Sequence, residues 1–265
     1  MEILGYTFAF CIGILLSLLG GGGSILTVPV LVYIFQIQPN FATAYSLFIV
    51  GISSLAGSVS YMRQGMASVK TALFFSFPSF VMVFVMRKFV VPIIPDIVWQ
   101  TENLVLHKNT LTMTCFALLM LIASYSMIKK QKKLTENIDA INKRINYPII
   151  FFEGLIVGAL TGFVGVGGGF LIVPVLTFFV KLPMKMAVGT SLLIIAINSC
   201  FGFLGDLGQF PIDWVFILKF LAFALSGVFI GIYLAKYTNN QQLKPVFGWM
   251  TLTLGLAILL KEVFF

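Results

Sequence analysis

The chain has 265 residues, of which 59% are hydrophobic and 10% are charged, and its mean hydropathy is +1.04. A soluble domain carries roughly 25% charged residues, because polar side chains must cover its core. The composition therefore excludes a soluble globular fold and predicts an all-α polytopic membrane protein whose outer surface faces lipid.

The net charge of +8 comes from 17 basic and 9 acidic side chains, and the basic residues are spread over short loops instead of forming one patch. This distribution is typical of membrane topology signals, so no nucleic-acid partner is expected. Cys11, Cys115 and Cys200 lie far apart within apolar runs, without the spacing of a metal or redox site. We therefore expect no metal and no cofactor.

The apolar runs predict ten helical segments. No charged side chain occurs between Ile3 and Met62, a length that allows up to three crossings at about 20 residues each. Glycine-rich and polar interruptions divide this stretch, and further apolar runs follow it. The expected segments are approximately 3–19, 23–37, 41–62, 70–91, 109–128, 148–165, 168–180, 185–205, 214–235 and 244–261.

A polar linker at 129–146 separates two sets of five segments and contains six basic residues. Short basic loops stay in the cytoplasm, so the linker is expected inside. Counting outward from it, twelve basic residues fall inside and four fall outside, namely Arg87, Lys88, Lys108 and Lys261. Both termini are then expected outside. A re-entrant hairpin made by the first two segments would leave every later loop on the same side, so the charges do not distinguish it from two full crossings.

The sequence contains an internal repeat with an offset of 145 residues. This offset aligns GGGGSILTVPVL, at 20–31, with GVGGGFLIVPVL, at 165–176, and gives 18 identities in the 55 positions from 10 to 64. We therefore divide the chain into a first membrane repeat (1–128), the linker (129–146) and a second membrane repeat (147–265). An odd number of segments in each half predicts two inverted repeats, an arrangement characteristic of secondary transporters.

Each repeat has a glycine-rich break where lipid would otherwise require an unbroken helix. Breaks of this kind free backbone N–H groups and tend to line a path, and the helix that follows favours an anion at its N-terminus. The alternative is that small residues provide close helix packing. The candidate binding residues in these elements are Gly20, Gly22, Gly23, Ser24 and Pro29, and then Gly165, Gly167, Gly168, Gly169 and Pro174.

Uncharged polar side chains follow each break on one helical face. Ser46, Ser53 and Ser54 correspond in the repeat to Ser191, Asn198 and Ser199, and Thr190 precedes Ser191. Hydroxyl and amide groups can replace part of the hydration shell of an anion, although they also link helices in lipid. We take Ser46, Thr190, Ser191 and Asn198 as candidate binding residues. Gln64 and Gln209, also equivalent, are predicted to gate the path or cap helices.

Charged residues near the apolar segments each have a simple explanation. Lys219 and Glu153 lie close to segment ends and can extend toward the membrane surface, and Asp206 and Asp213 are placed in the outer loop between two segments. Each acidic residue is also a candidate for carrying a coupling proton. The chain has no nucleotide-binding or hydrolase motif, so no enzyme activity is expected, and transport would be driven by an ion or solute gradient.

The duplicated break followed by proline, together with AVGTS at 187–191, resembles the sulfite exporter TauE/SafE family over nearly the whole chain. The resemblance implies a permease of a bacterial inner membrane or an archaeal membrane for small anions such as sulfite and sulfonates. The two glycine breaks, the two prolines, Thr190 and Ser191 match its motif. In the first half the motif differs, because Tyr45 stands where threonine is expected before Ser46.

We therefore predict a secondary transporter that moves a small anion, a sulfur oxyanion or an organosulfonate, by alternating access. A proton or sodium ion is the expected coupling partner, and the sequence predicts no oligomeric state. An anion channel with the same pore, or a membrane scaffold that transports nothing, are the alternatives.

Overall fold

The computed structural model describes residues 2–95, 97–101, 104–128, 147–164, 169–178, 180, 182–208, 212–238 and 240–264. The helices are α1 (Glu2–Leu19), α2 (Gly22–Pro29), α3 (Pro39–Arg63), α4 (Val69–Val85), α5 (Val91–Ile93), α6 (Lys108–Ile128), α8 (Tyr147–Val164), α9 (Gly169–Phe178), α10 (Met184–Asp206), α11 (Trp214–Ala235) and α12 (Asn240–Phe264). Two π-helical turns, η1 (Val30–Ile34) and η2 (Met86–Val90), continue α2 and α4. The predicted all-α membrane fold is confirmed.

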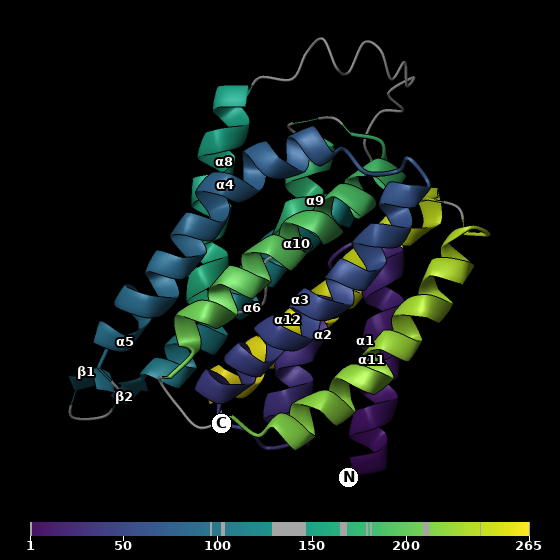
Figure 1. Ribbon diagram of the computed structural model, residues 1–265. Helices are drawn as coiled ribbons and strands as arrows, with labels where there is room; N and C mark the ends of the chain where they lie inside the picture. Colours follow the sequence, from purple (N-terminus) through teal and green to yellow (C-terminus); the bar gives the residue numbers. More distant parts are fainter. Residues whose placement is uncertain are drawn as a thin grey trace.

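Within the described residues, four helical stretches are long and apolar enough to cross a membrane, namely Pro39–Arg63, Val69–Ile93, Met184–Asp206 and Trp214–Ala235. In α3 and α10, 72% of the most apolar stretch is buried, whereas in α4 and α11 the share is 39%. Large apolar side chains such as Phe77, Phe152 and Phe229 are exposed on the outside, where lipid is the solvent. The pair α3 and α10 therefore forms the centre of the molecule, between α4 and α11 (Figure 1).

The first 35 residues form an antiparallel helical hairpin. Gly23, at the start of α2, lies against Leu16, and Phe35, just after η1, packs on Tyr6 with ring centroids 5.6 Å apart. The chain therefore turns back at Gly20, where φ is +66°. The first arm starts, and the second arm finishes, on the side of the bundle where the N- and C-termini lie (Figure 1). We call this side the termini end. The return arm has 8 residues in α2 and 5 in η1, or about 20 Å of helix.

The offset of 145 residues also relates helix boundaries in the structure. Helices α1 and α8 begin at Glu2 and Tyr147 and end at Leu19 and Val164. Likewise, α3 and α10 begin at Pro39 and Met184, and α4 and α11 at Val69 and Trp214. The two halves therefore share the starting positions of these helices as well as the sequence identities.

The same offset relates contacts between the central helices. A Cβ atom at Gly57 of α3 would lie 3.2 Å from Leu192 of α10, and one at Gly202 of α10 would lie 3.2 Å from Leu47 of α3. Gly57 corresponds to Gly202 and Leu47 to Leu192, so the two contacts are equivalent. They also show that α3 and α10 run antiparallel.

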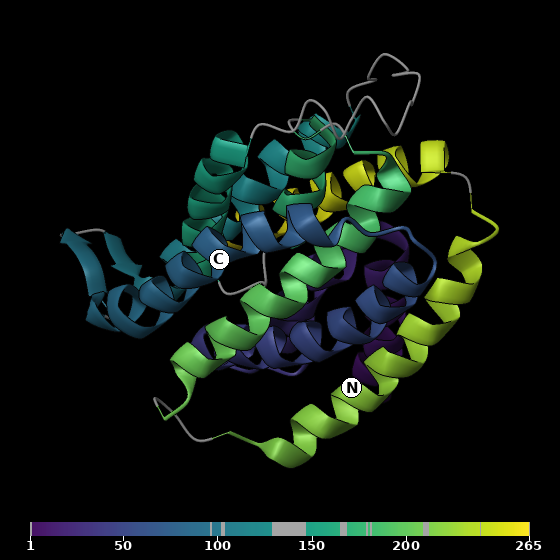
Figure 2. The same cartoon turned by 45° about the horizontal axis from the view of Figure 1, so that its top comes forward.

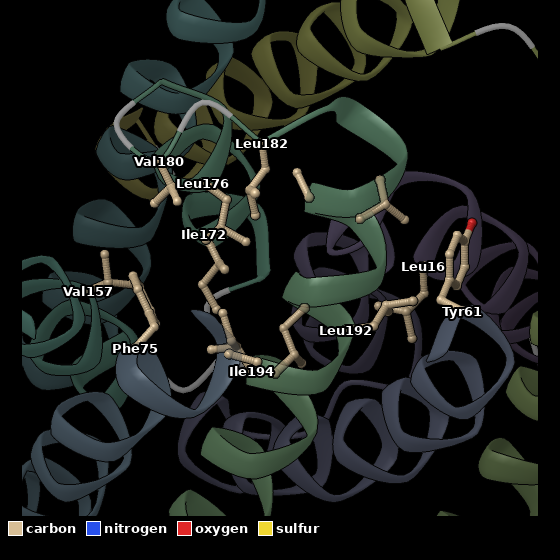
Figure 3. Close-up of a cluster of buried hydrophobic side chains, with 14 of the residues drawn as sticks. Leu16, Tyr61, Phe75, Val157, Ile172, Leu176, Val180, Leu182, Leu192 and Ile194 are labelled. Carbon is tan, nitrogen blue, oxygen red and sulfur yellow. The ribbon is translucent and has the colours of Figure 1, made fainter. Parts of the chain in front are cut away.

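The largest part of the core surrounds α10. Leu192 packs near Leu16 and Tyr61, and Ile172, Leu176 and Leu182 lie on its other side (Figure 3). These side chains come from α1, α3 and α9 and from the turn before α10, so the core joins elements of both halves. Their burial packs α9 and α10 of the second half against α1 and α3 of the first half.

A short β-hairpin differs from the sequence prediction, which placed no strand in the chain. β1 (Ile97–Thr101) pairs antiparallel with β2 (Leu104–His107), with Thr101 opposite Leu104. The hairpin lies at the edge of the helical bundle (Figure 2). Both strands contain β-branched or aromatic residues, which favour strands, in runs too short to cross a membrane as helices.

Close helix packing at equivalent glycines gives a test of the fold. A Cβ atom at Gly13 would overlap the Ala224 carbonyl of α11, and one at the equivalent Gly158 would overlap the Ser79 carbonyl of α4. We expect Gly13→Val and Gly158→Val each to lower the free energy of unfolding by about 1–3 kcal/mol through overpacking. Thermal unfolding in detergent measures this effect. Cys11→Val, at an exposed position of α1, is the control and should change little. Equal stability of all three variants would contradict this packing.

Candidate functional site

The tip of the first hairpin lies against the second half of the chain. A Cβ atom at Gly20 would lie 2.6 Å from Val188 Cα of α10, and one at Gly21 would lie 2.8 Å from Gly169 Cα, at the start of α9. The structure therefore brings Gly20 and Gly169, both predicted site residues, to one place. Gly165, Gly167 and Gly168 lie outside the described residues.

The helix that starts at this tip has amides available for a ligand. Gly21 occupies the N-cap of α2 and provides no side-chain cap, and the first amides of a helix, here from Gly22 and Gly23, have no partner within it. Ser24 Oγ donates instead to the Gly21 carbonyl at 2.6 Å. Gly22, Gly23 and Ser24 are buried. The tip is thus a polar backbone region surrounded by protein.

The two predicted prolines occupy different places in their helices. Pro29 is the last residue of α2, and the π-helical turn η1 follows it directly. Proline cannot donate to the helical ladder, which accounts for a change of hydrogen-bond pattern at this point. Pro174 lies buried within α9. Both shape the short helices after the breaks, and neither side chain offers a polar group to a ligand.

Ser191 and Thr190 hold elements together. Ser191 Oγ lies in hydrogen-bond contact with the Gly20 carbonyl and 2.8 Å from the Val188 carbonyl, so it fastens the hairpin tip to α10. Thr190 Oγ1 accepts a hydrogen bond from Ser68 N at 2.9 Å. Both hydroxyls are therefore used within the protein in this state.

The Thr190 bond has an equivalent in the other half. Asp213 N donates to the Tyr45 hydroxyl at 3.0 Å, and Tyr45 and Asp213 correspond to Thr190 and Ser68. Ser68 and Asp213 are also the side chains that cap α4 and α11. Tyr45, at the position where the sequence departs from the family motif, thus makes the hydrogen bond that threonine makes in the second half.

A second group of predicted polar residues is buried along α3 and α10. The hydroxyls of Ser46, Ser53, Ser54 and Ser199, with that of Ser76 on α4, have no hydrogen-bond partner within the described part of the chain. Asn198 donates to Ser79 Oγ at 2.6 Å, while its Oδ1 has no partner there. Buried polar atoms are normally hydrogen-bonded. This group, which we call the polar seam, therefore offers free acceptors and donors between the two halves.

A cleft opens at the end of the bundle opposite the termini end. It has a volume of about 160 Å³ and is lined by Leu18, Tyr61, Gln64, Met66, Met184, Lys185, Val188, Ile232, Ala235 and Lys236. Leu18 precedes the hairpin tip by two residues, and Val188 lies against Gly20, so the cleft borders the tip, although Gly20, Gly21 and Gly169 do not line it. Two lysines give it a positive field. Gln64, predicted to gate or cap, lines this cleft, and Gln209 lies outside the described residues.

One buried ion pair was not predicted. Arg87 was counted on the outer side and Asp206 was placed in an outer loop, but Arg87 lies in η2 and Asp206 is the last residue of α10, and each is 3% exposed. Arg87 Nη2 lies 2.7 Å from Asp206 Oδ2 and donates to Thr43 Oγ1 at 3.0 Å. Asp206 lies one residue beyond the predicted segment 185–205, whereas Arg87 lies within the predicted segment 70–91 and was counted only by its side of the membrane. Glu153 also keeps both carboxylate oxygens buried without a hydrogen-bond partner in the described residues.

Comparison with known proteins places this site in a family context. The sequence matches the family "Sulfite exporter TauE/SafE" over residues 6–258. The "Probable membrane transporter protein" of Xylella fastidiosa (strain 9a5c) is 27% identical over 254 residues, which cover 95% of this chain and 92% of that protein. The "Probable membrane transporter protein YdhB" of Bacillus subtilis (strain 168) is 25% identical over 230 residues, which cover 87% of each chain. Because the family match spans nearly the whole chain, this protein is a membrane transporter that belongs to the sulfite exporter TauE/SafE family.

Proposed function

We propose that this transporter moves a small anion, a sulfur oxyanion or an organosulfonate, by alternating access. The observation that carries the proposal is the cleft with Lys185 and Lys236, whose lining residues Leu18 and Val188 lie next to the tip of the first hairpin, where Gly21 meets Gly169 of the second half. A positive cleft attracts anions, and uncovered amides at a helix start can bind them. Such a path suits a small anionic cargo.

Alternating access requires two halves that can exchange conformations, and the repeat supplies them. Helices at equivalent positions, α3 and α10, run antiparallel, as the contacts of Gly57 and Gly202 show. This arrangement supports two inverted repeats, 1–128 and 147–265, around a central site. In this state the cleft lies at the end opposite the termini end, and a second cavity, lined by Tyr45 and Phe216 among others, lies at the termini end. Exchange of the two conformations would close the cleft and open the termini end.

The cleft end is proposed to face the cytoplasm of the cell. Arg63, Lys70, Lys185 and Lys236 lie near this end, and the basic linker 129–146 joins helices that end and begin there. Basic loops remain in the cytoplasm, so both termini would lie outside. The proposed location is a bacterial inner membrane or an archaeal membrane, and the proposed direction of transport is export, in line with the family description.

Uncharged groups are proposed to bind the anion inside the protein. The amides of Gly22 and Gly23 and the free hydroxyls of the polar seam, Ser46 among them, are donors without a net charge. Such donors can replace the hydrogen bonds that the anion loses when it leaves water, and because they carry no positive charge they still allow the anion to be released. Ser191 and Thr190, which bond to Gly20 and Ser68, would act by positioning these elements.

Flux measurements in proteoliposomes test the function. We expect saturable uptake of labelled sulfite, sulfate or a short sulfonate, with counterflow, and a rate that rises with an imposed proton or sodium gradient. Counterflow requires a binding site that alternates between the two sides, so it separates a carrier from a channel. Conductance far above carrier turnover would favour the channel instead, and no flux for any of these anions would remove them as cargo.

The two cleft lysines should raise the local concentration of the anion. We expect Lys185→Gln with Lys236→Gln to lower initial anion uptake about 3- to 10-fold at low ionic strength. The difference should disappear near 1 M salt, where the Debye length is about 3 Å. Lys70→Gln removes an exposed lysine outside the cleft at the same end and serves as the control. An effect of the same size in the control would contradict a role of the cleft.

The hairpin tip should tolerate no side chain at Gly20. Gly20 and Gly65 have nearly the same φ, +66° and +68°, but only at Gly20 would a Cβ atom collide with a neighbouring backbone. Alanine strains both positions by about 1–2 kcal/mol. We expect Gly20→Ala to reduce flux more than tenfold with expression retained, and Gly65→Ala to reduce it less than twofold. Equal flux in the two variants would show that the tip is not part of the path.

A further inference from the structure

The Arg87 cluster, formed by Arg87, Asp206 and Thr43, fastens the two halves at the termini end. Arg87 on η2 and Thr43 on α3 belong to the first half, and Asp206 on α10 belongs to the second. Nη2 of Arg87 contacts both partners, Asp206 Oδ2 at 2.7 Å and Thr43 Oγ1 at 3.0 Å. Within the described part of the chain, Arg87 and Asp206 are the two charged residues that are buried. The cluster is therefore a dry, charged contact between the repeats.

The positions equivalent to this cluster line the open cleft. The offset of 145 residues relates Thr43 to Val188 and Arg87 to Ile232, and it relates Tyr61 to Asp206. Val188, Ile232 and Tyr61 all line the cleft at the opposite end of the molecule. One set of three equivalent positions thus lies along the cleft, with Tyr61 and Val188 themselves buried, while the other set is joined by an ion pair. The two ends therefore differ in the contact that holds the halves together, a difference that the proposed alternating access would use.

A buried ion pair suits a contact that must both close and open. Removing two charges from water is costly, and the attraction between them offsets that cost without a large net gain. When the contact opens, water hydrates both charges, so opening carries little penalty. An apolar seal would instead expose hydrophobic surface when it opened. The Arg87 cluster is therefore better suited to a contact that opens and closes than to one that stabilises the fold.

Resting on the proposed function, we propose that the Arg87 cluster is the gate at the termini end and that Arg87 is an anion-binding residue of the path. The Arg87 guanidinium is held by the Asp206 carboxylate in this state. A guanidinium recognises the planar oxygen pairs of carboxylates and oxyanions in the same way. When the gate opens, the transported oxyanion replaces Asp206 on Arg87. A solitary buried arginine would hold the anion tightly, and the competing carboxylate of Asp206 allows its release.

Cysteine labelling measures the gate without requiring transport. The background replaces Cys11, Cys115 and Cys200 by alanine, and the purified protein is held in nanodiscs so that both ends are open to solvent. Leu47→Cys reports the termini end, because Leu47 is fully buried one turn after Thr43. Ile232→Cys, at a partly exposed position that lines the cleft, is the reporter for the cleft end.

Asp206→Asn removes the charge that holds the gate closed. We expect the labelling of Leu47→Cys by a small membrane-impermeant thiosulfonate to become at least tenfold faster, while that of Ile232→Cys becomes slower. Methanesulfonate should then protect Leu47→Cys, and Arg87→Gln should abolish the protection. Unchanged labelling of Leu47→Cys in Asp206→Asn would overturn the gate, and protection that survives Arg87→Gln would overturn anion binding by Arg87.

A double apolar variant keeps the test decisive if Asp206→Asn does not fold. Arg87→Met with Asp206→Leu replaces the pair by a permanent seal. We expect a well-folded protein with slow Leu47→Cys labelling and at least a 100-fold loss of flux. Wild-type flux in this variant would show that the pair only supports the fold. If the wild-type chain moved none of the tested anions, the proposed function would fail, whereas the labelling of Asp206→Asn would still decide the gate.

Discussion

Backbone amides in a membrane have no water to bind, so a helix can break there only against protein or a polar path. The rest of this structure depends on how that constraint is met at Gly20 and Gly21. The break lies against Val188 and Gly169, and Ser191 contacts the Gly20 carbonyl. The absence of side chains at Gly20, Gly21 and Gly169 allows these backbones to approach. The antiparallel crossing of α3 and α10 then sets where the hairpin tip lies relative to the cleft.

Much of the fold could be predicted because each helix obeys a local rule. Runs without charged residues predicted the helices. The repeated glycines, followed by Pro29 in the first half and Pro174 in the second, predicted the short helices after the breaks. These signals depend on composition and spacing along one segment. The β1–β2 hairpin was missed, because its strands are short and no apolar run distinguishes them from a loop.

The candidate site was predicted less completely, because its contacts join residues far apart in the sequence. Gly21, next to the predicted Gly20, does meet Gly169. Thr190, however, bonds to Ser68 across 122 residues, and the position of Thr190 on its helix could not indicate this partner. Taken alone, Arg87 and Asp206 each resemble a charged residue of a loop. Only the packing of η2 against α10 shows that they neutralise each other. The exact offset of 145 residues is the signal that could have paired them, since their equivalents meet at the cleft.

The crossing of α3 and α10 has a consequence for how substitutions affect such a transporter. Ile52 and Ile197 are equivalent residues near the middle of the two helices, where Gly51 lies against Ser199. Under the proposed alternating access, positions close to this crossing would keep neighbours of nearly the same kind, so a change there would affect both end states alike. Positions far from the crossing, such as Thr43 and Val188, would exchange their surroundings between the two states. Sequence differences between the halves would therefore shift the balance between the two states chiefly when they lie at the helix ends.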